Sequence, residues 1–322
     1  MRIFGDFIQR NPKLFGIMGY HSGIYCVLRL GSQPEANSLI DAADDAIIEE
    51  IAQTGASFFP ANFENGVATG EMGIPAIAPT KLHALGVRDA TYHGHSFDSF
   101  YYHFGLLGYE VELGIAQNAV GLSAQDALDG QGFLEYEKQR EASDRRLLKF
   151  WETSAKSEPL FAEWETVEHP QLGTVEVGGF LEHRHNPLLC ILEPIAAGSS
   201  GFIVDHARRH PRVELASLSV TPVGDGTFKV CAEVVNSGQL PSHVTNKGKE
   251  LPVRFAPVTA RLRPAEGCSL LSTAGEQTLG HLAATAGGRA EWFVAGRSGA
   301  ALGELELRGA AGGDSRVAVA AP

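Results

Sequence analysis

The chain has 322 residues, a formal net charge of -12, a hydrophobic fraction of 44% and a charged fraction of 20%. This composition is that of a globular protein with a packed core, and the length allows two domains of about 100–200 residues each. Because phosphate binding needs clustered Lys and Arg, the acidic balance excludes nucleic acid and anionic membrane as the main partner.

The cysteines lie far apart and include no Cys-x-x-Cys pair, so neither a zinc ribbon nor a dense disulfide framework is expected. They are Cys26, Cys190, Cys231 and Cys268. No stretch approaches the ~18 apolar residues of a membrane span. Residues 1–10 lack the architecture of a signal peptide and are typical of the end of a helix.

The first part of the chain alternates strand-like and helical segments, which predicts an α/β fold. Residues 14–20 form a short apolar run suited to a buried strand, and residues 24–30 resume as a second strand. His21 should therefore lie at a strand end, at the lip of a sheet, where α/β folds place their chemistry. Apolar residues at helical spacing predict a helix over 41–53 that ends at Gly55.

The segments that follow continue this alternation. Residues 56–90 are rich in Gly, Pro and Asn and predict a long surface excursion, which is often functional. The aromatic segment 97–105 predicts a helix, and the polar–apolar alternation of 106–113 predicts a strand. Further helices are expected over 133–153 and 200–209.

After Pro211 the pattern becomes all-β. Two alternating segments flank a Gly224-Asp-Gly226 turn and predict a hairpin. About seven or eight short strands with Gly-rich turns predict an immunoglobulin-like sandwich over 212–322, which follows a first domain over 1–211. The expected strands are 213–220, 227–235, 252–263, 268–272, 289–295, 302–308 and 315–320.

Short segments of the chain resemble the zinc metallocarboxypeptidases of the carboxypeptidase A type. Gly19-Tyr-His-Ser-Gly23, followed by Val27-Leu-Arg29, resembles the family's segment that supplies the third zinc ligand. The stretch from Tyr92 to Leu113 resembles the closing segment, in which a Tyr precedes a helix and a strand ends in Glu-Leu. Residues 169–187 resemble the C-terminal extension of bacterial members that carry a β-sandwich.

The resemblance implies a mixed-sheet α/β enzyme that uses zinc to release C-terminal residues from peptides. Such a zinc takes three protein ligands and a water, whose proton a nearby carboxylate accepts. The resemblance makes His21 a zinc ligand, Glu112 the general base and acid, and Tyr92 the residue that closes over the substrate. Ser99 departs from the family pattern, which has Trp at that position.

The family's other two zinc ligands come from a His-x-x-Glu motif, and none of the twelve histidines has Glu three positions later. The resemblance therefore implies that the catalytic domain begins upstream and that this chain is inactive and binds zinc weakly. It also implies an exposed apolar sheet edge beside the His21 strand, prone to self-association. Localisation stays open, because a true N-terminus would lie upstream.

Each candidate residue also has a structural interpretation. A His after an apolar strand is more often a hydrogen-bonded structural residue than a ligand. Glu110 shares a strand face with Glu112, since residues two apart on a strand point the same way. Two other functions stay open: a non-catalytic remnant that acts as a binding or structural β-sandwich protein, and an altered metal site that uses His21, His93 or His95 with Glu112.

Overall fold

The structure is a computed structural model that describes residues 2–23, 25–31, 39–59, 63–64, 67–68, 79–81, 95–120, 133–153, 159–251 and 254–322. It contains a mixed α/β region followed by a C-terminal β-rich region, as the sequence predicted. One compact unit comprises Met18–Asp98 and Gly108–Asp205, and the other comprises Met1–Ile17, Ser99–Leu107 and His206–Pro322. No helix in the described part of the chain is long and apolar enough to cross a membrane.

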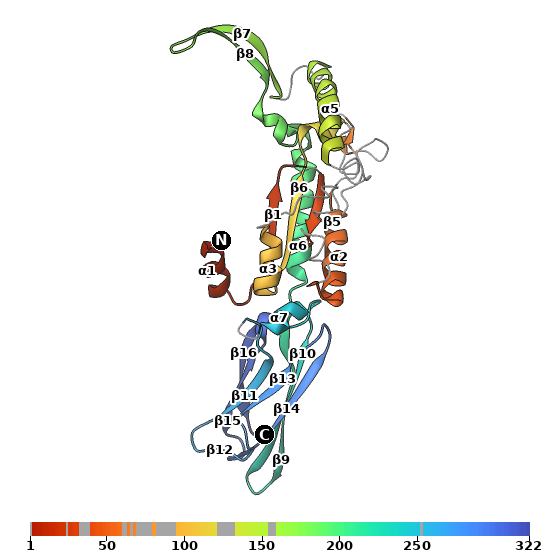
Figure 1. The fold of residues 1–322 in the computed structure, drawn as a ribbon. Coiled ribbons are helices and arrows are strands. Elements are labelled where there is room, and N and C mark those ends of the chain that lie inside the picture. Colours follow the sequence, from red (N-terminus) through yellow and green to blue (C-terminus); the bar gives the residue numbers. More distant parts are fainter. Residues whose placement is uncertain are drawn as a thin grey trace. The chain divides into compact units, whose positions relative to one another are not determined.

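The α/β region carries the following elements in chain order (Figure 1). They are α1 (Arg2–Arg10), β1 (Gly16–His21), β2 (Tyr25–Arg29), α2 (Ala42–Ala56), β3 (Phe63–Glu64), β4 (Val67–Ala68), β5 (Pro79–Lys81), α3 (Ser96–Phe104), β6 (Leu107–Leu113), α5 (Phe133–Thr153), β7 (Phe161–His169), β8 (Gly173–Phe180) and α6 (Leu192–Arg208). Short 3-10 helices are η3 (Ala116–Val120), η4 (Glu182–His185) and η5 (Leu189–Ile191).

The C-terminal region is built almost entirely of strands. Its elements are β9 (Val213–Gly224), β10 (Thr227–Asn236), α7 (Asn246–Glu250), β11 (Val258–Pro264), β12 (Ser269–Leu270), β13 (Glu276–Gly280), β14 (Gly287–Ala295), β15 (Ala301–Arg308), η6 (Ala310–Gly312) and β16 (Asp314–Ala320). The strand expected over 252–263 begins only at Val258, and β13 was not predicted. The other expected strands of this region are present within a few residues of their predicted bounds.

A four-stranded sheet organises the α/β region, with the strand order β1-β6-β2-β5. Strand β6 is antiparallel to β2. The Leu107 N–H donates to the Phe15 carbonyl 3.0 Å away. Four residues further along the chain from Phe15, Gly19 of β1 lies against Glu110 of β6. Both contacts advance in the same direction, so β1 and β6 are parallel and end at the same edge of the sheet.

Helices α2 and α6 cover one face of this sheet. The Tyr109 hydroxyl on β6 donates to the Ile48 carbonyl on α2, and the Tyr109 ring lies 5.6 Å from that of Phe202 on α6. Gly55, predicted to end its helix, lies inside α2 instead. The reason is close packing, because a Cβ on Gly55 would lie 2.3 Å from the Phe202 ring.

The start of α3 packs against the opposite face of the sheet. A Cβ on Gly108 would lie 2.8 Å from Phe97 Cα, so only glycine allows this helix to approach β6 so closely. Because side chains alternate along a strand, Glu110 and Glu112 lie on the same face as Gly108. The approach of α3 therefore decides which polar groups of its first turn can reach these carboxyl groups.

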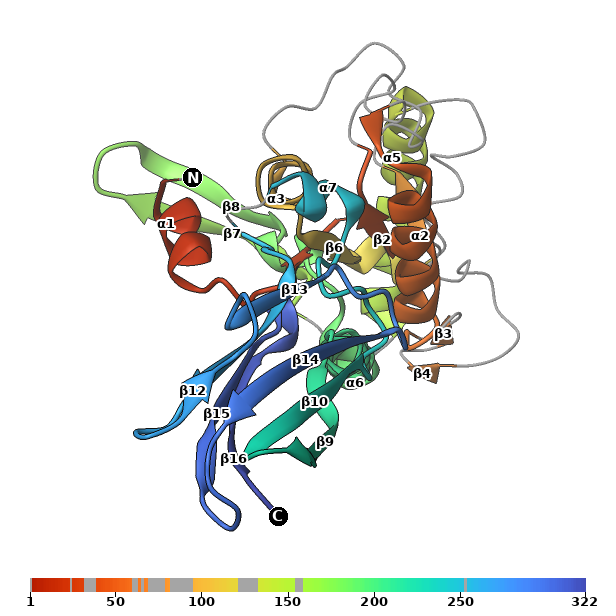
Figure 2. The same ribbon diagram turned by 90° about the horizontal axis from the view of Figure 1, so that it is seen from below.

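The C-terminal region consists of two antiparallel four-stranded sheets with a shared apolar core (Figures 1 and 2). Their strand orders are β12-β14-β10-β9 and β13-β11-β15-β16. Trp292 is fully buried in this core, and its indole N–H donates to the Gly275 carbonyl at 3.0 Å. Burial of this apolar cluster is the main stabilising contribution to the region.

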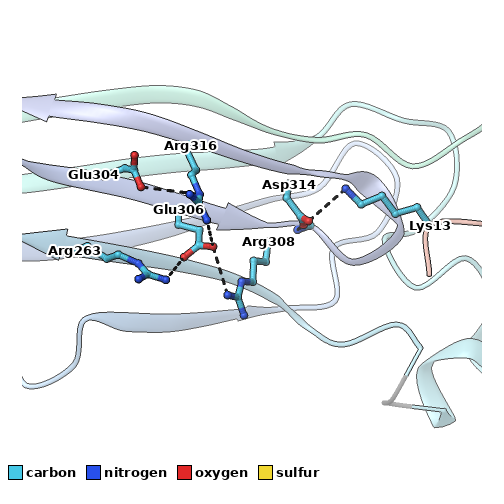
Figure 3. A network of polar contacts seen from close by, with 8 residues as sticks. Lys13, Arg263, Glu304, Glu306, Arg308, Asp314 and Arg316 are labelled. Carbon is cyan, nitrogen blue, oxygen red and sulfur yellow. Dashed lines mark hydrogen bonds and ion pairs between the residues drawn. The ribbon is translucent and has the colours of Figure 1, made fainter. Parts of the chain in front are cut away.

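A carboxyl group surrounded by arginines lies on the outward face of the second sheet (Figure 3). The Glu306 side chain is 8% exposed and accepts hydrogen bonds from Arg263, Arg308 and Arg316 at 2.9, 3.4 and 3.3 Å. The hydrogen bond from Arg263 and the charges of Arg308 and Arg263 hold the pKa of Glu306 at about 2, against the opposing effect of burial. The ionised form of this carboxyl group is therefore strongly favoured in the folded state.

Glu306→Gln should lower the melting temperature at pH 7, because three guanidinium groups lose their shared anion. A folded-state pKa below the unfolded value stabilises the fold above the unfolded pKa, and this contribution is lost as the pH falls towards 2. The difference between the variant and the unmodified chain should therefore shrink below pH 4 in thermal melts followed by circular dichroism. Glu304→Gln, which removes a more exposed carboxyl group on the same strand, is the matched control. Equal effects of both variants would contradict the prediction.

Candidate functional site

The candidate site lies where β1 and β6 end at the same edge of the sheet. The Tyr20 hydroxyl reaches the Ser199 carbonyl of α6 at 3.3 Å, so Tyr20 points to the face that α6 covers. Its neighbour His21 therefore points to the opposite face, the one that carries Glu110 and Glu112. The sequence predicted His21 and Glu112 at neighbouring strand ends, and this placement is confirmed.

Glu110 is the hydrogen-bonded carboxyl group of the site. It is 5% exposed; His95 Nδ1 lies 3.3 Å from Glu110 Oε2, and the Ser96 hydroxyl donates to Oε1. Burial alone would raise its pKa, but the hydrogen bonds from His95 and Ser96 outweigh burial and lower it. The hydrogen bond to Glu110 in turn raises the pKa of His95, which favours the protonated imidazole beside the Glu110 carboxylate.

Glu112 is the carboxyl group that lacks such partners. Its Oε2 is buried and has no hydrogen-bond partner among the described residues, although the residue as a whole is partly exposed. Burial and the negative charge of Glu110 raise the pKa of Glu112 to about 7, while the charge of His95 opposes the shift. A Cβ on Gly23 would lie 2.2 Å from Oε2, so a larger residue in the turn after β1 would require the Glu112 side chain to shift.

Cys26 on β2 is the cross-strand neighbour of Glu112. It lies directly opposite Glu112 in the β2–β6 register and is 1% exposed. Burial, with the charge of Glu112 as a second cause, raises the pKa of its thiol well above the ordinary value. The thiol is therefore neutral and offers Glu112 no counter-charge.

This arrangement separates the pKa values of two carboxyl groups on one strand face. Glu110 is ionised and held by His95 and Ser96, whereas Glu112 exchanges its proton near neutral pH. Pairs of titratable groups whose environments push their pKa values apart are typical of acid–base sites. The geometry therefore supports proton transfer at Glu112.

The donor set of the site does not fit the predicted zinc. Within the residues that the structure describes, no three His, Cys, Asp or Glu side chains come together as a metal ion would require. The altered metal site considered from the sequence is therefore not seen with His21, His95 and Glu112, and it stays untested with His93. Tyr92 and His93 lie outside the described residues.

Sequence reasoning missed two members of the site, Ser96 and Cys26, and considered His95 only as a possible ligand of the altered metal site. The sequence predicted that Glu110 and Glu112 share one face of a strand, but it did not indicate which of the two carboxyl groups is hydrogen-bonded. That difference depends on the contact between α3 and β6, for which Gly108 is the only local signal.

Comparison with known proteins matches residues 212–320 to a family described as Domain of unknown function (DUF8731). No curated protein matches the chain. A solved structure of DesR, a β-glucosidase from Streptomyces venezuelae in complex with D-glucose, is 16% identical, with 34% of this chain and 15% of that chain covered and a TM-score of 0.16. A GH20 exo β-N-acetylglucosaminidase from Vibrio harveyi in complex with N-acetylglucosamine is 12% identical, with 35% and 18% covered and a TM-score of 0.18. The chain spans less than a fifth of either neighbour, and these scores are too low to transfer a fold or a function.

The assignment to the zinc metallocarboxypeptidases is wrong. The family whose model matches the chain is DUF8731, over residues 212–320, and no curated carboxypeptidase matches it. The structure shows a general reason for the misleading motifs. A Cβ on Gly19 would lie 3.2 Å from Glu110 Cγ and one on Gly23 would lie 2.2 Å from Glu112 Oε2, so local packing accounts for these glycines without a zinc site.

Glu112→Gln should stabilise the chain at alkaline pH. The folded-state pKa of about 7 lies above the unfolded value, so the wild-type contribution is present at low pH and lost as the pH rises through 7. The variant should exceed the wild type by on the order of 2–3 kcal/mol at pH 9 and match it at about pH 4 and below, where the folded and unfolded states both carry the proton, since one pKa unit corresponds to about 1.4 kcal/mol. Urea unfolding at both pH values measures this, with Glu193→Gln on α6 as the exposed control. A difference that does not vary with pH would contradict the assigned pKa.

Proposed function

We propose that the chain is a hydrolase in which Glu112 accepts a proton from the attacking water. The observation that carries this proposal is a partly exposed carboxyl group whose pKa is raised to about 7. General bases work best when their pKa lies near the operating pH, and positioned acid–base groups contribute typically ~10²–10⁴-fold. The proposal rests on this carboxyl group and not on membership of a family.

The reaction needs two proton transfers, one from the attacking water and one to the leaving group, and the residues around Glu112 are consistent with both. Glu112 would take a proton from water as the water oxygen bonds to the carbonyl carbon, and would pass that proton to the departing amine. Glu110 remains ionised through its contacts with His95 and Ser96, so it keeps the proton affinity of Glu112 high. A peptide with a free C-terminus is the substrate class that the sequence resemblance implied; with the family assignment overturned, it is the first substrate to test and not one that the Glu112 site selects.

The proposal is tested by hydrolysis assays on peptides with free C-termini across pH 5–9. The rate should rise with pH and level off above the Glu112 pKa of about 7. Glu112→Gln should reduce kcat by ~10²–10⁴-fold and leave the circular dichroism spectrum unchanged. Glu193→Gln should behave as the wild type. A wild-type chain without hydrolysis, or a Glu112→Gln variant with full activity, would overturn the proposal.

Zinc is the cofactor that the sequence predicted, but the described residues do not bring together the three ligands that a zinc ion needs. A catalytic zinc needs three protein ligands, and only His21 was expected from the sequence. We therefore expect the purified chain to retain far less than one zinc per chain after dialysis, as measured by mass spectrometry of the metal. Stoichiometric zinc that is lost in His21→Ala would contradict this and would place further ligands outside the described residues.

A second candidate is a non-catalytic binding or structural protein with an immunoglobulin-like sandwich. The matched family covers residues 212–320 and leaves out the Glu112 site, which favours this alternative. Catalysis that depends on Glu112 decides between the two, because a binding protein would show no pH-dependent turnover. Self-association through the edge strand β1 is a further expectation from the sequence.

A further inference from the structure

The hairpin of β7 and β8 is a two-stranded sheet with no third strand hydrogen-bonded to it in the described structure (Figure 1). Its base is packed, since the rings of Phe161 and Phe180 lie 5.4 Å apart and Trp151 lies 5.3 Å from Phe161. Beyond this base both long edges present backbone N–H and C=O groups. An isolated two-stranded ribbon is marginally stable in water, and open edges are templates for strand pairing.

The two faces of the hairpin differ in chemistry. The register pairs Val167 with Val175 and Glu165 with Val177 on one face. On the other face it pairs Glu168 with Thr174, whose hydroxyl donates to Glu168 Oε1 at 2.5 Å. Thr166 and Glu176 form the next pair on that face. One face is therefore largely apolar, and the other is acidic.

An exposed tryptophan extends the apolar face. Trp164 is 63% exposed and lies in the bulge between Ala162 and Glu165. Gly179 has φ +100, and a Cβ there would lie 3.3 Å from the Trp164 indole, so the indole lies over this glycine. Large exposed aromatic side chains beside apolar neighbours mark interaction sites.

The negative charge of the hairpin indicates that its partner carries basic side chains. Residues 161–180 contain four Glu and no Lys or Arg. Because like charges repel, a second copy of the hairpin is disfavoured, whereas basic side chains would be attracted to the acidic face. An added strand would place alternate side chains on the two faces, apolar on the side of Trp164 and basic on the acidic side, next to Glu168 if it pairs with β7 or next to Glu176 if it pairs with β8.

We propose that the β7–β8 hairpin binds an extended segment of a partner protein by strand addition, with basic and apolar residues alternating in that segment. Main-chain hydrogen bonds to an open edge supply affinity, and the contrast between the two faces supplies specificity. This surface is separate from the Glu112 site and does not depend on the proposed function.

The test uses a synthetic peptide of about eight residues that alternates lysine and valine, titrated into the full chain. Trp164 is the reporter, since the other two tryptophans, Trp151 and Trp292, are 7% and 0% exposed. Binding should shift the tryptophan emission to shorter wavelength. A peptide that alternates glutamate and valine should not bind, nor should a lysine–valine peptide N-methylated at alternate residues.

The variants separate strand addition from general attraction to an acidic chain. Glu168→Lys combined with Glu176→Lys should weaken binding by roughly tenfold or more, because whichever edge the peptide pairs with then presents a lysine to its basic side chains. Glu214→Lys combined with Glu266→Lys makes the same change in net charge on exposed positions elsewhere and should leave binding unchanged.

Three results would overturn the proposal. The first is equal weakening by both pairs of variants, and the second is unchanged binding of the N-methylated peptide. The third is self-association of the chain, seen by analytical ultracentrifugation, that Trp164→Ala abolishes, because the occupant would then be a second copy.

Discussion

Strand β6 lies between β1 and β2, and its alternation places Glu110 and Glu112 on one buried face of the sheet. Two carboxyl groups so close together in an apolar wall cannot both ionise easily. The two carboxyl groups have different partners. His95 and Ser96, at the start of α3, hydrogen-bond to Glu110, whereas Glu112 has no hydrogen-bonded cation among the described residues. The proton affinity of Glu112 follows from that asymmetry.

Glu306 in the C-terminal region is a second buried carboxyl group, and its pKa is shifted in the opposite direction. Glu306 is also held within a sheet face, yet the guanidinium groups of Arg263 on β11 and Arg308 on the same strand lower its pKa to about 2. Glu112 has Cys26 at the corresponding cross-strand position, and its pKa is about 7. The same side chain therefore stabilises the fold in one place and costs stability in the other, and only the second can exchange a proton near neutral pH.

Periodicity was enough to predict most elements, because helix and strand patterns are local. The span of α5 was predicted without error, and β2, β6 and the hairpin after Pro211 within a few residues. The strands β7 and β8 were not predicted, although Val175 and Val177 alternate with polar residues. In the described structure these two strands pair only with each other and do not pack on a core, so the sequence lacks the longer apolar alternation of a half-buried strand. Gly55 was misread as a helix end because its role is the contact with Phe202, which is distant in sequence.

The candidate site was predictable only in part, for the same physical reason. The strand-end positions of His21 and Glu112 follow from local pattern, whereas the hydrogen bonds of Glu110 depend on tertiary contacts with α3. The family motifs misled because glycines next to carboxyl groups satisfy packing needs that are common to unrelated proteins. Residue types at a strand end thus predicted where chemistry is possible and did not predict which family performs it.

The proton affinity of Glu112 is the central claim, and carbon-13 NMR of side-chain carboxyl groups in a glutamate-labelled chain measures it directly. One resonance, absent from Glu112→Gln, should titrate with a midpoint near 7. A midpoint near 4.5 for that resonance would show that Glu112 is an ordinary ionised surface carboxylate, and the account of this site would fail.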